Sequence, residues 1–345
     1  MFPAGRGSAL APLESGPLHA GMPLVSVLMV FHRDTPFLRP AIASVLGQTL
    51  RDLELVLVDN GTGLTPAALG DAGQDPRLTW VRLPANVGIP GGHNAGVQAA
   101  RGEFVALLDY DDLARPQRLE RQVAALRADP RLGLVSALAE RIDAEGRSLG
   151  RVFCLPDSAG HRAYAQFAAP VVTPAATVRR EVLEALPYRA EFPFAADLDF
   201  QARLSERWPM AVLPEVLLDY RWYADQTTQQ RGTSIEQSRA AIQLAAARRR
   251  AGRPEDLTGI LQALAAPTAA ESWRRVASLC LAEGYGLPAA YGARRSFALE
   301  RTGRALLDAM RLGAQAWRQA APSERMLVAR MFLTGPLRAL GLRPA

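Results

Sequence analysis

The sequence predicts an α/β domain with a mainly parallel central sheet over residues 23–232 and a helical extension over residues 233–345. Three observations support this fold class. From residue 25 onwards, short β-rich runs alternate with segments of helical periodicity, which is the pattern of βαβ units. Several of these runs are apolar throughout, as in strands that are covered on both faces. In the extension Ala, Leu and Arg dominate, and Thr233 with Glu236 forms a capping box that predicts a helix start.

The elements of the domain follow from the same patterns. Five apolar runs are expected to be strands, namely 25–30, 53–58, 78–83, 104–108 and 133–138. Helices are expected between the first two strands, after the third and after the fourth. From residue 150 to 232 the pattern is less regular, with strands expected within 171–178 and 211–223 and a loop entering a helix within 191–206.

Composition limits the class of protein. With 345 residues, 49% of them hydrophobic and 21% charged, the chain is long enough to bury a large core and is not of the disordered or fibrous type. The two cysteines, Cys154 and Cys280, are far apart, and there are four histidines. This content indicates neither a disulfide framework nor a structural zinc site, and it favours a reducing, cytoplasmic compartment.

The N-terminus and the hydropathy pattern bear on localisation. Residues 1–22 contain Glu14 and no continuous apolar stretch, so they predict a disordered leader and not a signal peptide. No run of 18 or more apolar residues is present, so no transmembrane helix is predicted. We expect a cytoplasmic protein, with peripheral contact at the inner face of the membrane left open.

Acidic turns follow two of the expected strands. Asp59 comes after the second strand, and Asp109, Asp111 and Asp112 come after the fourth. Ligands of an open parallel sheet bind outside the carboxyl ends of its strands. Clustered carboxylates repel one another unless a cation holds them, and such oxygen ligands suit Mg²⁺ or Mn²⁺ bridging to phosphate. The alternative is an exposed helix N-cap, a position that Asp also favours.

Four stretches resemble the inverting family 2 glycosyltransferases, whose fold is called GT-A. The likeness covers about residues 24–228. The opening VSVLMVFHRDTPFLRPAIASVLGQTLRDLELVLVDNGT is similar to the first strand, helix and second strand of that family. NVGIPGGHNAGVQAARGEFVALLDYDD resembles the segment that leads to its metal-binding D-x-D motif. FAADLDFQARL resembles the helix start that carries the catalytic base, and LDYRWYADQTT resembles the segment that closes the domain.

The resemblance implies roles for particular residues. It implies that Asp59 contacts the nucleotide base, that Asp109 contacts the ribose or diphosphate, and that Asp111 and Asp109 hold Mn²⁺ or Mg²⁺. Asp112 is expected to shape the turn. The remaining nucleotide-sugar-binding positions implied are Asn60, Asn86 and Asn94.

The catalytic base is a choice between two neighbouring carboxylates. The resemblance implies that Asp197 is the base, whereas Asp199, two residues further on a helix, points in a clearly different direction. The alternative for Asp197 is a cap on a helix that begins near Leu198. We expect Asp197→Asn to lose transfer and Asp199→Asn to be milder.

Because of two departures from the family pattern, the identity of the donor nucleotide stays open. Val30-Phe31-His32-Arg33 stands where the family usually has Pro-Thr-Tyr-Asn, and His93 precedes Asn94 where many members have Arg. The glycines of GIPGGHNAG do not form a G-x-G-x-x-G fingerprint, and we expect them to allow close approach to the sheet.

The function implied is transfer of a sugar from a nucleotide-sugar donor to an acceptor hydroxyl, with inversion, in the synthesis of surface polysaccharide or another glycan. The acceptor is a glycan, a lipid-linked glycan or a protein. One alternative is a nucleotidyltransferase that makes a nucleotide-sugar, although MVFHRDTP offers no Gly-rich basic loop for a triphosphate. A catalytically inactive sugar-binding relative is the other.

The positive charge is concentrated in the extension. Residues 236–345 contain 17 arginines and 8 acidic residues, and the net charge of the whole chain is +6. We expect no nucleic-acid partner. Three interpretations stay open for this region, namely a solvated helical face, a homodimer interface and contact with anionic lipid. The arginines proposed for lipid contact are Arg248, Arg249, Arg250, Arg294 and Arg295.

Overall fold

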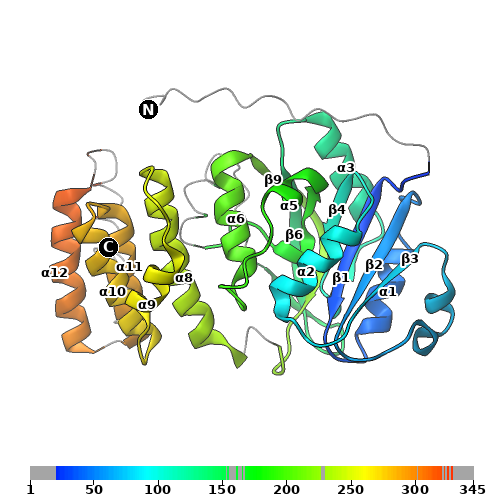
Figure 1. The fold of residues 1–345 in the computed structure, drawn as a ribbon, viewed down its shortest axis with the longest axis horizontal. Helices are drawn as coiled ribbons and strands as arrows, with labels where there is room; N and C mark the ends of the chain where they lie inside the picture. Colours follow the sequence, from blue (N-terminus) through cyan, green and yellow to red (C-terminus); the bar gives the residue numbers. More distant parts are fainter. Residues whose placement is uncertain are drawn as a thin grey trace. The chain divides into compact units, whose positions relative to one another are not determined.

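A computed structural model, shown in Figure 1, describes residues 21–152, 154, 161, 165, 168–226, 230–300, 302–320, 322, 325 and 328. The chain forms two compact units on either side of Gln226. The first is the α/β domain and the second is the helical extension. Apart from its last two residues, the leader expected over residues 1–22 lies outside the described residues.

The first unit is built on one twisted sheet with the strand order β3-β2-β1-β4-β8-β6-β9-β5. The four strands of its first half are parallel to one another. They are β1 (Val25–Phe31), β2 (Leu53–Asn60), β3 (Leu78–Leu83) and β4 (Phe104–Leu107). The α/β class and the parallel character predicted from the apolar runs are therefore confirmed.

The second half of the sheet is mixed. There β8 (Thr177–Arg179) is antiparallel to β4 and β6, while β9 (Met210–Arg221) is parallel to β6 (Leu134–Ile142). The short strand β5 (Leu113–Ala114) is antiparallel to β9, and β7 (Ser148–Arg151) is antiparallel to β6. Two 3-10 segments, η1 (Pro66–Gln74) and η2 (Thr173–Ala175), complete the connections.

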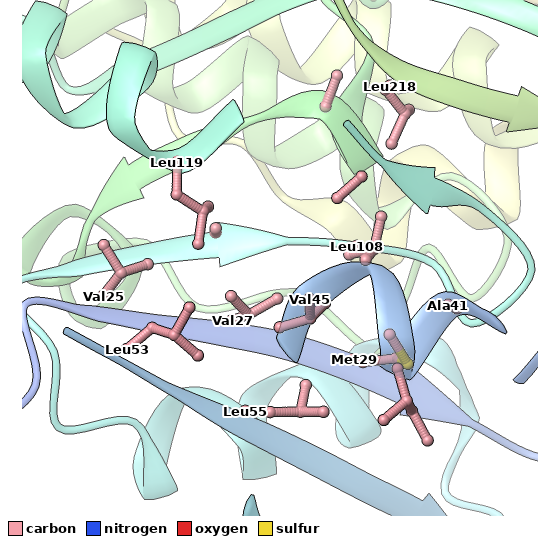
Figure 2. Close-up of a cluster of buried hydrophobic side chains, with 14 of the residues drawn as sticks. Val25, Val27, Met29, Ala41, Val45, Leu53, Leu55, Leu108, Leu119 and Leu218 are labelled. Carbon is pink, nitrogen blue, oxygen red and sulfur yellow. The ribbon is translucent and has the colours of Figure 1, made fainter. Parts of the chain in front are cut away.

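Helices cover both faces of the sheet, which explains why its central strands are apolar throughout. On one face, α1 (Leu38–Leu46) and α3 (Arg118–Ala128) pack against the side chains of β1 and β2, as Figure 2 shows for Val25, Val27 and Leu55. On the other face lie α2 (Gly88–Ala99), α5 (Arg180–Ala185) and α6 (Ala196–Arg207).

The glycines of α2 let that helix lie close to the sheet. A β-carbon on Gly96 would come within 2.1 Å of Leu28 Cδ1, and one on Gly92 within 2.6 Å of Val30 Cγ1. A larger residue at either position would push the helix away from the strands. This close approach places the first turn of α2 next to the carboxyl ends of β1 and β2.

The second unit consists of packed helices in the part of the chain that the structure describes. They are α8 (Gly232–Arg250), α9 (Leu257–Leu264), α10 (Ala269–Ala282), α11 (Gly286–Glu300) and α12 (Gly303–Gln319). The capping box expected at Thr233 is wrong, because α8 already begins at Gly232. Glu236 instead accepts hydrogen bonds from Arg295 (2.8 Å) and from the indole of Trp273 (3.0 Å). Within the described ranges, no helix is long and apolar enough to cross a membrane.

Candidate active site

The acidic turn after β4 holds three carboxylates with different surroundings. Asp109 is exposed, whereas Asp111 is 7% exposed and Asp112 is fully buried. Desolvation by the surrounding protein, followed by the charges of Asp111 and Asp197, raises the pKa of Asp109 to about 7. Asp109 therefore has access to solvent although much of its surroundings is protein.

Asp112 shapes the turn, as expected. Its Oδ1 accepts a hydrogen bond from the backbone N–H of Arg221 at 2.8 Å. Burial, followed by the charges of Asp111 and Asp109, raises its pKa well above the ordinary value. Because it is enclosed and bonded to the backbone, Asp112 is not accessible to a ligand from solvent.

Asp111 is held by the segment that follows β9. The hydroxyl of Tyr223 donates to Asp111 Oδ2 at 2.8 Å, and Arg221 Nε donates to the Asp111 carbonyl at 2.9 Å. Arg33, at the end of β1, donates to the hydroxyls of Tyr110 (3.0 Å) and Tyr223 (3.3 Å). Two segments distant in sequence, one after β1 and one at the end of β9, therefore hold the acidic turn at Asp111.

Asp197 lies in the first turn of α6 and is half-buried. Its Oδ2 accepts a hydrogen bond from the hydroxyl of Thr173 at 3.2 Å, and its Oδ1 accepts one from the N–H of Leu198 at 2.8 Å. The residue at the N-cap position is Ala195, so Asp197 does not cap the helix. The charge of Asp197 contributes to the raised pKa of Asp109.

Asp199 is withdrawn from this site. Its carboxylate is fully buried and forms ion pairs with Arg189 and with Arg203, the latter at 2.9 Å. The structure thus separates two carboxylates that stand two residues apart in the sequence. The expectation that Asp199→Asn is the milder change applies to catalysis alone. The change should lower stability, because it removes the negative charge with which two largely buried guanidinium groups pair.

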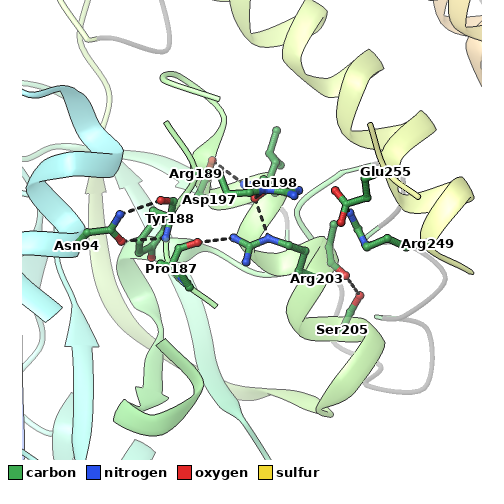
Figure 3. Close-up of polar contacts among 12 residues, drawn as sticks. Asn94, Pro187, Tyr188, Arg189, Asp197, Leu198, Arg203, Ser205, Arg249 and Glu255 are labelled. Carbon is green, nitrogen blue, oxygen red and sulfur yellow. Dashed lines mark hydrogen bonds and ion pairs between the residues drawn. The ribbon is translucent and has the colours of Figure 1, made fainter. Parts of the chain in front are cut away.

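Asn94 connects α2 to the loop before α6, as Figure 3 shows. Its Nδ2 donates to the Tyr188 carbonyl at 2.8 Å, and its Oδ1 accepts from the Tyr188 N–H at 2.9 Å. The Tyr188 ring stacks on Phe200 of α6. Asn94 therefore helps to place α6, and its direct contact with a nucleotide-sugar stays a prediction.

The expected nucleotide-contacting residues at the end of β2 mainly hold loops. Asp59 is fully buried and accepts from the N–H (2.8 Å) and the hydroxyl (2.7 Å) of Thr62. Asn60 accepts from the Val87 N–H (2.9 Å) and donates to Asn86 Oδ1 (3.2 Å). Asn86 itself is exposed. Direct contact of Asp59 with a base stays a prediction.

Arg118 is a buried charged residue near the acidic turn that the sequence pattern did not single out. It is 1% exposed and donates to the carbonyls of Leu107 (2.7 Å) and Ala176 (3.1 Å). Burial lowers its pKa to about 10, against the opposing charges of Asp112 and Asp109. It is a buried cation behind the acidic turn. One feature of the sequence could have indicated its burial, namely that Arg118 directly precedes Leu119 on the apolar face of α3.

Comparison with known proteins adds the decisive observation. A family model described as "Glycosyl transferase family 2" matches residues 26–186, which include the acidic turn, the segment of Thr173 and the sheet apart from β9. Residues 26–186 therefore form a glycosyl transferase family 2 domain. The resemblance seen in the motifs is confirmed, and a glycosyltransferase is favoured over the nucleotidyltransferase that the sequence left open.

Relatives of this glycosyltransferase cover different parts of it. An uncharacterized glycosyltransferase of Methanocaldococcus jannaschii is 28% identical over 207 residues, which are 58% of this chain and 71% of the relative. The succinoglycan biosynthesis protein ExoO of Rhizobium meliloti is 37% identical over 102 residues, which are 30% of this chain and 29% of the relative. A crystal structure of S. aureus TarS 1-349 covers 93% of both chains with a TM-score of 0.52 and 16% identity, which shows a shared fold.

Proposed function

We propose that this glycosyltransferase moves a sugar from a nucleotide-sugar donor to an acceptor hydroxyl with inversion, and that Asp197 is the general base. One observation carries the proposal. The half-buried carboxylate of Asp197 lies in the first turn of α6, and its charge raises the pKa of Asp109 in the acidic turn. The site therefore pairs an acidic turn with a separate carboxylate that comes from a different element.

This pairing suits a single in-line displacement at the anomeric carbon. Asp197 takes the proton of the acceptor hydroxyl while the new carbon–oxygen bond forms on one face of the sugar. The bond from the anomeric carbon to the diphosphate oxygen breaks on the opposite face, and the nucleoside diphosphate leaves with the electron pair. The configuration of the anomeric carbon is inverted because the two faces are opposite.

The acidic turn suits a divalent metal ion. Asp109 is exposed, and Asp111 accepts a hydrogen bond from the hydroxyl of Tyr223 through one of its oxygens. Within the described residues, no group of three His, Cys, Asp or Glu side chains is arranged to hold a metal by itself. Mg²⁺ and Mn²⁺ are commonly held by one or two carboxylates together with substrate phosphates. When bound, the ion would supply positive charge to the leaving diphosphate.

The acceptor is proposed to be a growing glycan. ExoO is named for succinoglycan biosynthesis, and it resembles this chain over 102 residues. We extend that role to this chain as a place in polysaccharide synthesis. The identity of the donor sugar and of the nucleotide is to be found by experiment.

We also propose contact with an anionic lipid surface, but through a different face from the one expected. Arg248 pairs with Glu283 at 2.6 Å and Arg295 pairs with Glu236 at 2.8 Å, so these charges are neutralised within the second unit. Helix α12 instead has an exposed apolar stripe, in which Leu307 is 69%, Met310 56% and Trp317 45% exposed.

Three exposed arginines border that stripe. Arg304, Arg311 and Arg318 repeat at intervals of seven residues and therefore form a row beside it. An apolar stripe next to a basic row is typical of helices that lie on anionic membranes. A homodimer interface is the rival explanation for the same face.

The experiment for the catalytic proposal uses two steps. A thermal-shift panel of nucleoside diphosphates and nucleotide-sugars with Mn²⁺ identifies the donor, because a ligand that binds only the folded state raises the melting temperature. Release of nucleoside diphosphate from that donor is then measured with and without EDTA. Full activity in excess chelator would exclude the metal, and the absence of any stabilising nucleotide would overturn the donor class.

A further inference from the structure

The segment 171–177, which precedes α6 in the chain, is held in place by buried polar side chains. Gln122 of α3 donates to the Ala175 carbonyl at 2.5 Å, and Ser136 of β6 donates to the Val172 carbonyl at 3.0 Å. Both side chains are fully buried. Because this backbone is fixed from two elements, Thr173 within it has a defined position.

Gln201 of α6 fixes the same segment from the other side. It is 1% exposed, and its Oε1 accepts a hydrogen bond from the Val171 N–H at 3.3 Å. Its Nε2 donates to the Val171 carbonyl at 3.2 Å and to Thr173 Oγ1 at 2.8 Å. The backbone of Val171 presents one donor and one acceptor, so the orientation of the Gln201 amide is determined.

This orientation decides the direction of the Thr173 hydroxyl. Thr173 Oγ1 accepts from Gln201, and its single hydrogen is then available for Asp197 Oδ2 at 3.2 Å. The other oxygen of Asp197 accepts from the Leu198 N–H. Both oxygens are therefore anchored, and each keeps a lone pair because a carboxylate oxygen can accept more than one hydrogen bond.

We propose that Thr173 and Gln201 are positioning residues for the base, acting through Asp197. The inference rests on the proposed function, because it assumes that Asp197 takes the proton of the acceptor. A hydroxyl that donates to a carboxylate stabilises its ionised form and restricts its rotation. A base must be held within hydrogen-bond reach of the proton it removes, so this pair serves that requirement.

The test compares Thr173→Val, Thr173→Ser and the matched control Thr177→Val in the full chain. Thr177 lies in the same segment and is fully buried, but its hydroxyl donates to Gln122 Oε1 at 2.7 Å and has no contact with Asp197. The readouts are kcat and KM for release of nucleoside diphosphate from the donor found in the panel, together with the melting temperature.

Thr173→Val should lower kcat by about 10- to 100-fold, the range expected for loss of a hydrogen bond to a charged group. The KM for the donor should stay within about twofold, because the hydroxyl faces the base and not the acidic turn. Thr173→Ser should restore kcat, since it returns the hydroxyl. In an Asp197→Asn background, Thr173→Val should have no further effect on kcat, because the group it positions is gone.

Two results would overturn the inference. One is a normal kcat for Thr173→Val together with an inactive Asp197→Asn enzyme. That result would show that Asp197 acts as the base without the hydroxyl of Thr173. The other is an equal loss of kcat in Thr177→Val, which would indicate general loosening of the segment. By contrast, an Asp197→Asn enzyme with normal kcat would contradict the proposed base itself, so the two failures are distinguishable.

Discussion

The hydroxyl of Tyr223 donates a hydrogen bond of 2.8 Å to Asp111 Oδ2, although 112 residues separate the two in the chain. Tyr223 follows the last strand of the sheet, and Asp111 follows the fourth. Through this contact, the segment that follows β9 holds the acidic turn that follows β4. It makes the orientation of a proposed metal ligand dependent on a segment far from the D-x-D motif.

Tyr223→Phe should weaken the binding of the metal ion without unfolding the protein. Loss of a residue that orients a metal ligand typically costs about 10- to 100-fold in metal affinity or activity. We expect the Mn²⁺ concentration for half-maximal activity to rise by about that factor. Tyr220→Phe is the control, because no hydrogen bond of its hydroxyl is found in the described residues. Equal Mn²⁺ titrations for wild type and Tyr223→Phe would contradict this role.

Asp111→Asn should abolish most of the transfer with little effect on folding. The change keeps the shape of the side chain but removes the charge that would hold the ion against the diphosphate. Activity is expected to fall by about 100-fold or more, the scale on which single charge-stabilising groups act in active sites. The melting temperature without nucleotide should change little. Near-normal activity of this variant would count against a metal at the acidic turn.

The raised pKa of Asp109 predicts a pH-dependent stability. Desolvation, followed by the charges of Asp111 and Asp197, raises this pKa from the ordinary 3.8 to about 7. The folded state therefore keeps a proton that the unfolded chain has lost, so this group lowers stability as the pH rises from about 4 to 7.

Asp109→Asn should remove this loss of stability at higher pH. Because Asp109 is exposed and partly screened by solvent, we expect a gain of only about 1 kcal/mol at pH 8, or about 2–4 °C in melting temperature. At pH 4 the variant and wild type should melt together. Melting curves in metal-free buffer across this range test the prediction, and an equal difference at both pH values would refute it.

Asp197→Asn and Asp199→Asn should fail in different ways. Asp197→Asn should keep nucleotide-sugar binding and lose about 10²- to 10⁴-fold in transfer rate, as expected for removal of a general base. Asp199→Asn should lose about 3–5 kcal/mol of stability, because it breaks the buried ion pairs with Arg189 and Arg203. Thermal melting and single-turnover transfer separate the two effects. A fully active Asp197→Asn enzyme would shift the search to a substrate group.

The basic row of α12 should control binding to anionic vesicles. Each basic residue near such a surface contributes about 1 kcal/mol, so replacing Arg304, Arg311 and Arg318 with Gln should weaken binding by about 100-fold. Flotation with phosphatidylglycerol-containing and neutral vesicles measures this. The control variant replaces three exposed arginines of the first unit, Arg39, Arg131 and Arg147. Equal binding to both vesicle types would reject the lipid, and a dimer in sedimentation would favour the rival interface.

Local patterns in the sequence were sufficient for the fold class and for part of the site. The apolar runs predicted the parallel strands, because a strand covered on both faces has to be apolar throughout. Asp109 and Asp111 could be predicted as a pair because both follow one such run, and the carboxyl ends of parallel strands share an edge. The motif around Asp197 pointed to a base through its resemblance to a family.

The tertiary structure decided which of these side chains are free to act. Asp197 and Asp199 are the same residue type two positions apart, and only the packing of Arg189 and Arg203 withdraws one of them from the site. In the same way Glu236, expected to cap a helix, is bonded to Arg295 on another helix. Local sequence patterns carry no information on such partners, because they are brought together by folding.

The sequence by itself determined the order of strands and helices along the chain and the acidic turn after β4, since each depends on neighbours within a few residues, and it pointed to Asp197 through the resemblance to a family. Only the tertiary structure decided that Thr173 is bonded to Asp197, that Tyr223 is bonded to Asp111, and that Asp59 is enclosed by its own loop. The first two bonds join residues 24 and 112 positions apart. The burial of Asp59 depends on how neighbouring strands and loops pack around it, and packing of that kind is a property of the folded chain.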